Sequence, residues 1–65
     1  MPNTVNIGDR FHPTDDLSSV YTVSAVSRFG HRITHATLTS DASDRLAVTV
    51  GIGELFDVTE WIPGR

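Results

Sequence analysis

Apolar residues recur mostly at every second position, in short runs separated by clusters of turn-forming residues. A period of two is typical of β-strands, because successive side chains of a strand point to opposite faces. The pattern predicts an all-β chain with strands over residues 5–11, 20–28, 32–40, 45–50 and 58–62, and a short 3-10 or helical turn within residues 52–57. A loop is expected over residues 12–19, because Pro13 cannot donate to a strand ladder.

The turn Phe29-Gly30-His31 carries the strongest hairpin signal in the chain. If Phe29 and Gly30 are the central turn residues, Tyr21 faces Leu38; if Gly30 and His31 are central, Val23 faces Leu38. Both registers predict the same core face, because they differ by two residues. That face holds Tyr21, Val23, Ala25, Ala36 and Leu38, and the opposite face holds Thr22, Ser24, Val26, Arg28, Ile33, His35, Thr37 and Thr39.

Two glycine-containing segments need separate interpretation. Gly8-Asp9 predicts a bend or bulge before Phe11. Gly51-Ile52-Gly53 has neither the third glycine nor the lysine of a phosphate-binding loop, and acidic residues follow it directly. We therefore expect a strand that ends in one helical turn, with Leu55 and Phe56 closing the core.

The order of elements is strand, long loop, three strands joined by short turns, a helical turn and a final strand. This layout resembles the small SH3-like barrel, which implies a five-stranded barrel spanning residues 1–65 as one domain. An OB-fold is the main alternative. The pattern Gly8-Asp9-Arg10-Phe11 early, with Glu54-Leu55-Phe56 before Trp61 late, also resembles small proteins of phages and mobile elements of high-GC bacteria.

Size and charge limit the partners. A domain of 65 residues buries only about 60% of the surface of its unfolded chain, and with no cysteine it has no disulfide to stabilise it. Self-association is therefore a reasonable expectation. The net charge of -3 disfavours general binding to nucleic acid, and no segment is apolar enough for a membrane span or a secretory signal. We expect a soluble cytoplasmic protein without a membrane partner.

Catalytic and cofactor sites are not expected. His31 and His35 on one strand would lie roughly 13 Å apart, too far to bind one metal ion, and no nucleophile motif is present. Plasmid-borne, trimethoprim-resistant dihydrofolate reductases also use SH3-like barrels of this size, with Val-Gln-Ile-Tyr in a late strand. Here that strand reads Val48-Thr49-Val50-Gly51, without the polar glutamine. We therefore predict a non-enzymatic protein with no cofactor and no metal.

Aromatic residues are spread along the chain and do not cluster as in peptide-binding SH3 domains, so Tyr21, Phe56 and Trp61 are expected in the core. The hairpin turn groups an aromatic residue with several basic residues: beside Phe29 it holds two of the five arginines and two of the three histidines. This mixture is common in protein interfaces and in sites that stack single-stranded bases. The charge balance favours a protein partner or a second copy over nucleic acid. The predicted partner-binding residues are Val26, Arg28, Phe29, His31, Arg32, Ile33 and His35.

Overall fold

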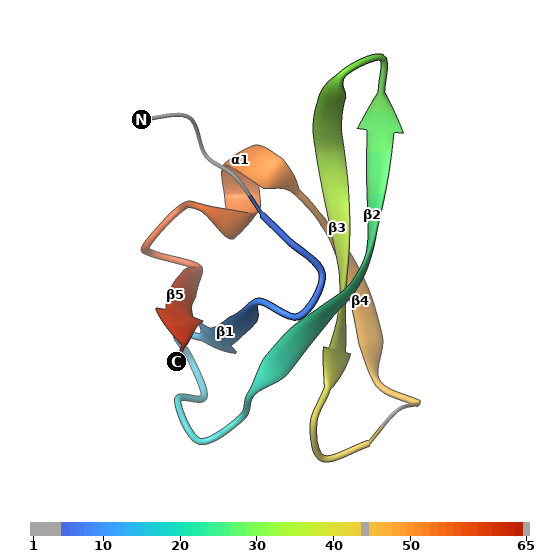
Figure 1. Ribbon diagram of the computed structural model, residues 1–65. Helices are drawn as coiled ribbons and strands as arrows, with labels where there is room; N and C mark the ends of the chain where they lie inside the picture. The colour runs from blue at the N-terminus through green and yellow to red at the C-terminus, as the bar shows by residue number, and fades with distance from the viewer. Residues whose placement is uncertain (1–4, 44, 65) are drawn as a thin grey trace.

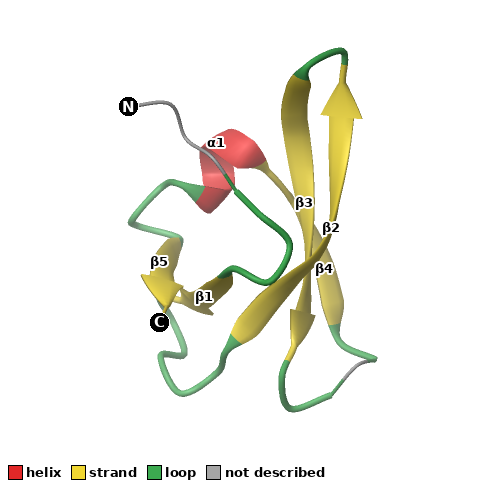
Figure 2. Cartoon of the chain, in the orientation of Figure 1, coloured by secondary structure: helices red, strands yellow, loops and turns green. Residues whose placement is uncertain are grey.

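The computed structural model describes residues 5–43 and 45–64, which form one curled antiparallel sheet and one short helix (Figures 1 and 2). The strands follow one another in the order β4-β3-β2-β1-β5, so β4 and β5 are the two edges of a half-barrel. The predicted all-β class with a helical turn before the last strand is therefore confirmed. The elements are β1 (Arg10–Pro13), β2 (Tyr21–Phe29), β3 (Arg32–Ser40), β4 (Ala47–Gly51), α1 (Ile52–Leu55) and β5 (Trp61–Gly64).

The long hairpin of β2 and β3 follows the second of the two registers. Phe29 pairs with Arg32, so Gly30 and His31 are the central turn residues, and Val23 pairs with Leu38 as that register requires. Gly30 has φ +64°, whereas no other described residue of the turn has a positive φ. A two-residue turn with positive φ at its first central position needs glycine there, which explains the strength of the hairpin signal.

Two register shifts in this hairpin change which side chains face the core. They lie between Val23 and Ala25 and between Ser27 and Arg28. Because a shift of one residue exchanges the faces of a strand, Val26 pairs with Ala36 and packs against the core. Ala25 is exposed instead, so its prediction as a core residue was wrong.

The first and last strands begin later than predicted. Gly8 has φ +101°, and the Asp9 amide donates to the carbonyl of Asn6 at 3.0 Å, so a turn precedes β1. Near the other end, Asp57 accepts hydrogen bonds from the backbone amide and the hydroxyl of Thr59. Such aspartate-centred turns replace strand pairing, which explains why residues 58–60 are not in a strand.

Both terminal strands contain a proline that was predicted to lie outside a strand. Pro13 ends β1 opposite Trp61, and Pro63 lies in β5 opposite Phe11. β5 is an edge strand, and β1 pairs with β2 only through Arg10 and Phe11. Proline is tolerated in these positions because its missing amide is not needed by a second neighbour.

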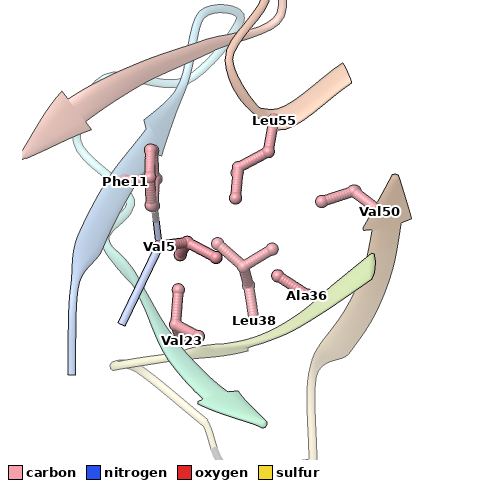
Figure 3. Packing of buried hydrophobic residues seen from close by; sticks show 7 residues of the cluster. All are labelled: Val5, Phe11, Val23, Ala36, Leu38, Val50 and Leu55. Atoms are coloured by element: carbon pink, nitrogen blue, oxygen red, sulfur yellow. The ribbon is translucent and has the colours of Figure 1, made fainter. Parts of the chain in front are cut away.

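The core lies on the concave side of the sheet. Leu55 projects from α1 into the space between Phe11 and Val50 (Figure 3), and it is 1% exposed. Phe56 packs edge-on against Phe11, with ring centroids 6.1 Å apart. The predicted closing role of α1 is therefore confirmed for Leu55. The buried hydrophobic residues are Val5, Phe11, Val23, Ala36, Leu38, Val50 and Leu55.

Leu46, Val48 and Val50 alternate along the predicted fourth strand, but this row of apolar side chains is buried at one end only. Val50 is buried, whereas Val48 is 39% exposed and Leu46, which lies before β4, is 56% exposed. In the part of the chain that the structure describes, β4 pairs on one side only, with β3. The exposure of Val48 therefore follows from its position at the edge of the half-barrel.

Alanine substitutions at two glycines should have opposite effects. Gly30→Ala should lower the free energy of unfolding by about 1 to 2 kcal/mol, because φ +64° is unfavourable for a residue with a Cβ. Gly53→Ala should raise it by about 0.4 to 1 kcal/mol, because Gly53 lies in α1, its φ is not positive and an added Cβ meets no atom within 4 Å. Urea unfolding of both variants measures the difference, and a stabilising Gly30→Ala would contradict the turn geometry.

Candidate functional site

The tip of the β2–β3 hairpin extends away from the rest of the molecule (Figure 1). Phe29 is 83% exposed there, the largest value among the exposed large hydrophobic residues of the described chain. A phenylalanine that no neighbour covers is unfavourable in water unless a partner buries it. Four charged or titratable residues around it are also exposed, namely Arg28, His31, Arg32 and His35. We call these five residues the hairpin tip.

Val26 and Ile33 do not belong to this surface, although both were predicted to lie on the non-core face. Both are partly buried and pack against the core. Val26 turns inward after the first register shift, and Ile33 pairs with Arg28 beyond the second. These two side chains are therefore less accessible than the five residues of the hairpin tip.

The two histidines of the hairpin tip belong to no larger group of metal ligands in the described residues. His35 Nδ1 lies 3.1 Å from the Thr34 hydroxyl, and His35 pairs with Ser27, one step further from the turn than the Arg28–Ile33 pair. Within residues 5–43 and 45–64, no group of three or more His, Asp or Glu residues could hold a metal ion. The chemistry that the hairpin tip offers is therefore contact through a ring and two guanidinium groups.

A second feature was not predicted. A cleft of about 480 Å³ lies between the two edge strands, with Val48 of β4 and Trp61 of β5 both in its lining. Tyr21 packs edge-on against Trp61, with ring centroids 5.5 Å apart and an interplanar angle of 85°. Asp15, Asp16 and Glu60 also line the space. We call these six residues the acidic cleft.

Three hydrogen bonds to backbone carbonyls fix the loop that borders the acidic cleft. The Thr14 amide donates to the Glu60 carbonyl at 3.0 Å, and the Thr14 hydroxyl donates to the Thr59 carbonyl at 2.8 Å. On the other side, His12 Nδ1 donates to the Ser19 carbonyl at 3.0 Å. The loop is thus attached to both β1 and the turn before β5, so the cleft has defined walls.

Asp16 is held as a carboxylate within this loop. The hydroxyls of Ser18 and Ser19 each donate to one of its oxygens, at 2.6 Å. These hydrogen bonds, that of Ser18 first, lower the pKa of Asp16 below its ordinary value. Asp57 is similar, because the hydrogen bonds from Thr59 lower its pKa.

Removing the hydroxyls of Ser18 and Ser19 should reverse the lowering of the pKa of Asp16. In the Ser18→Ala/Ser19→Ala variant, the pKa of Asp16 should rise toward the ordinary value of about 4, which an NMR titration of the carboxyl carbon measures. A lowered pKa favours the folded state above the unfolded pKa, and this contribution is lost as the pH falls through the folded pKa. The stability difference between wild type and variant should therefore shrink on acidification below about pH 4. An unchanged pKa in the variant would contradict the assignment.

Comparisons with protein-family models, with curated proteins and with solved structures find no match to this chain. In the described part of the chain, no helix combines the length and the apolar character needed to cross a membrane.

Proposed function

We propose that this protein is a non-catalytic binding module that contacts another protein through the hairpin tip. The observation that carries the proposal is the exposure of Phe29, 83%, at the end of a two-stranded arm and beside two exposed arginines. Aromatic and arginine side chains contribute the largest share of binding energy in most protein interfaces. The turn between β2 and β3 extends beyond the other strands (Figure 1), so a partner can bury Phe29 without disturbing the core.

We also propose that the sheet is an SH3-like barrel that is open between β4 and β5. The support is the connectivity: β1 pairs with both β2 and β5, and one helical turn joins β4 to β5. The helical turn between the fourth and fifth strands is the feature on which the sequence resemblance to SH3-like chains rests. An accessory role in a phage or mobile element rests on the sequence resemblance alone.

Charge favours a protein partner over nucleic acid. The chain carries eight acidic and five basic residues, whereas proteins that bind phosphate backbones usually have a basic excess. The hairpin tip supplies only two guanidinium groups, Arg28 and Arg32. Binding to single-stranded nucleic acid through Phe29 and these arginines is the second candidate function, since stacking on an exposed ring would use the same residues.

One comparison separates the two candidates. Fluorescence anisotropy with a labelled single-stranded oligonucleotide, at low salt and then at increasing salt, should show no saturable binding. Nucleic-acid binding would instead weaken steeply with salt and be lost in Arg28→Glu. In parallel, the tagged protein should retain a specific protein from an extract of its host, or a second copy of itself, and Phe29→Ala should not. Oligonucleotide binding combined with no protein capture would reject the proposal.

A further inference from the structure

The acidic cleft lies at some distance from the hairpin tip, because the loop between β1 and β2 that borders it is at the opposite end of the hairpin from the turn (Figure 1). Its volume of about 480 Å³ is within the range that holds a small ligand or a side chain. The proposed function at the hairpin tip makes no use of this cleft. Its lining is mixed: two aromatic rings, the apolar side chains of Pro13 and Val48, the hydroxyls of Thr14 and Ser19, and three carboxylates.

The ring pair gives the cleft a surface suited to a cation. Tyr21 and Trp61 stand almost perpendicular to each other and are both partly buried, so core contacts hold the rings while part of each faces the cleft. A cation placed against the face of a tryptophan or tyrosine is attracted by the electrons of the ring. An anion would be repelled by the same faces.

The carboxylates add to this preference. Asp15 and Asp16 come from the loop after β1, and Glu60 comes from the turn before β5, so negative charge approaches the rings from two segments far apart in sequence. Among the described residues that line the cleft, none is basic. The hydroxyls of Ser18 and Ser19 hold the Asp16 carboxylate in place in this lining. Phosphate groups and nucleic acids are therefore unsuitable occupants.

The position of the cleft identifies the kind of molecule that carries the cation. β4 and β5 flank the cleft as the two edges of the sheet, and their outer backbone groups have no strand partner in the described chain. An extended peptide can hydrogen-bond to such an edge while its side chains enter adjacent pockets. Arginine is the best matched side chain, because its planar guanidinium stacks on rings and binds carboxylates with two hydrogen bonds.

We propose that the acidic cleft binds an arginine side chain of an extended segment of a partner protein, with the guanidinium against Tyr21 and Trp61 and paired with Asp15 and Glu60. This site is separate from the hairpin tip, so the molecule has two binding surfaces. If the contact is of this kind, the binding affinity should depend on the charge of the bound side chain, which it would not do in a purely apolar groove.

Trp61 makes the proposal directly testable, because it is the only tryptophan in the chain and it lines the cleft. The probe is the peptide acetyl-Gly-Arg-Gly-amide, and the control is the same peptide with citrulline, which keeps the shape of arginine without its charge. Titration of wild-type protein at low salt should give a saturable change in tryptophan emission with the arginine peptide. The citrulline peptide should bind roughly tenfold or more weakly, as expected when hydrogen bonds to a charged group are lost.

Two variants locate the site: a double variant that removes two cleft carboxylates, and a control that removes one carboxylate outside the cleft. Asp15→Asn/Glu60→Gln should weaken binding of the arginine peptide by roughly tenfold, because it removes both proposed ion pairs. Glu54→Gln removes an acidic residue that does not line the cleft and should leave the affinity within about twofold. Far-UV circular dichroism and urea unfolding verify that the variants are folded. Phe29→Ala should leave the titration unchanged, which separates this test from that of the hairpin tip.

Three results would overturn the proposal. The first is equal binding of the arginine and citrulline peptides, or no saturable change with either. The second is an unchanged affinity in a folded Asp15→Asn/Glu60→Gln variant. The third is a tryptophan emission that changes on dilution of the protein alone, since this would assign the cleft to a second copy of the chain.

Discussion

Leu55→Ala is expected to lower the free energy of unfolding by about 2 to 5 kcal/mol, the usual cost of removing a fully buried leucine side chain. Leu55 is 1% exposed and lies in the single helical turn that covers the core between Phe11 and Val50 (Figure 3). A 65-residue domain has a total stability of about 3 to 10 kcal/mol, at 0.05 to 0.15 kcal/mol per residue. The substitution should therefore remove a large share of the total stability, and at the lower end of this range it would unfold the domain at room temperature.

Leu46→Ala is the matched control, because it makes the same chemical change at a side chain that is 56% exposed. Its effect should stay within about 0.5 kcal/mol. Urea unfolding followed by tryptophan fluorescence measures both variants, since the ring of Trp61 packs against the core. Equal unfolding midpoints for the two variants would show that α1 does not close the half-barrel.

Phe29→Ala is expected to weaken binding of the protein partner by roughly 30-fold or more, which corresponds to the 2 kcal/mol or more typical of a residue that dominates an interface. The stability of the domain should change by less than about 0.5 kcal/mol, because the side chain is 83% exposed and its loss leaves no cavity. Phe29→Ala should thus weaken partner binding while leaving the free energy of unfolding almost unchanged. The pair of measurements is an equilibrium binding assay and urea unfolding on the same preparation.

Ile7→Ala is the matched control for Phe29→Ala, since Ile7 is an exposed apolar residue, 67% exposed, that lies in the turn before β1. It should keep full partner binding. If both variants lose binding equally, the interface is not confined to the hairpin tip. If neither loses it, the hairpin tip is not the binding surface.

The hairpin could be predicted from the sequence because local chemistry determines it. Gly30 supplies the positive φ of the turn, and the structure follows one of the two predicted registers, with Val23 opposite Leu38. Leu55 was likewise predictable, since an apolar residue in a short helical turn between strands has only the core to cover. These features depend on residues that are close together in sequence.

The register shifts could not be predicted in the same way. Each one adds a residue to one strand only, so it leaves the alternating pattern intact on paper while it exchanges the faces that follow. Ala25 and Val26 exchanged places for this reason. Val26 gains a position against the core, and burial of the larger apolar side chain is the more favourable arrangement.

The acidic cleft required the three-dimensional arrangement. Its aromatic pair joins Tyr21 to Trp61, 40 positions apart, and its carboxylates come from two loops. Both rings were predicted to lie in the core, and both do pack against it. The sequence did not indicate that the sheet stays open between β4 and β5. The signal that could have found the cleft was the presence of acids at 15, 16 and 60 beside the aromatic residues Tyr21 and Trp61.

Site-specific photo-crosslinking tests the proposed binding module most directly. Benzoylphenylalanine is placed at position 29 in one variant and at position 7 in another, each is irradiated in the host cells, and the products are treated with nuclease or protease. We predict one discrete adduct from position 29 that resists nuclease, is destroyed by protease and is absent from position 7. No adduct from position 29, the same products from both positions, or an adduct that nuclease removes would contradict a protein-binding role for the hairpin tip.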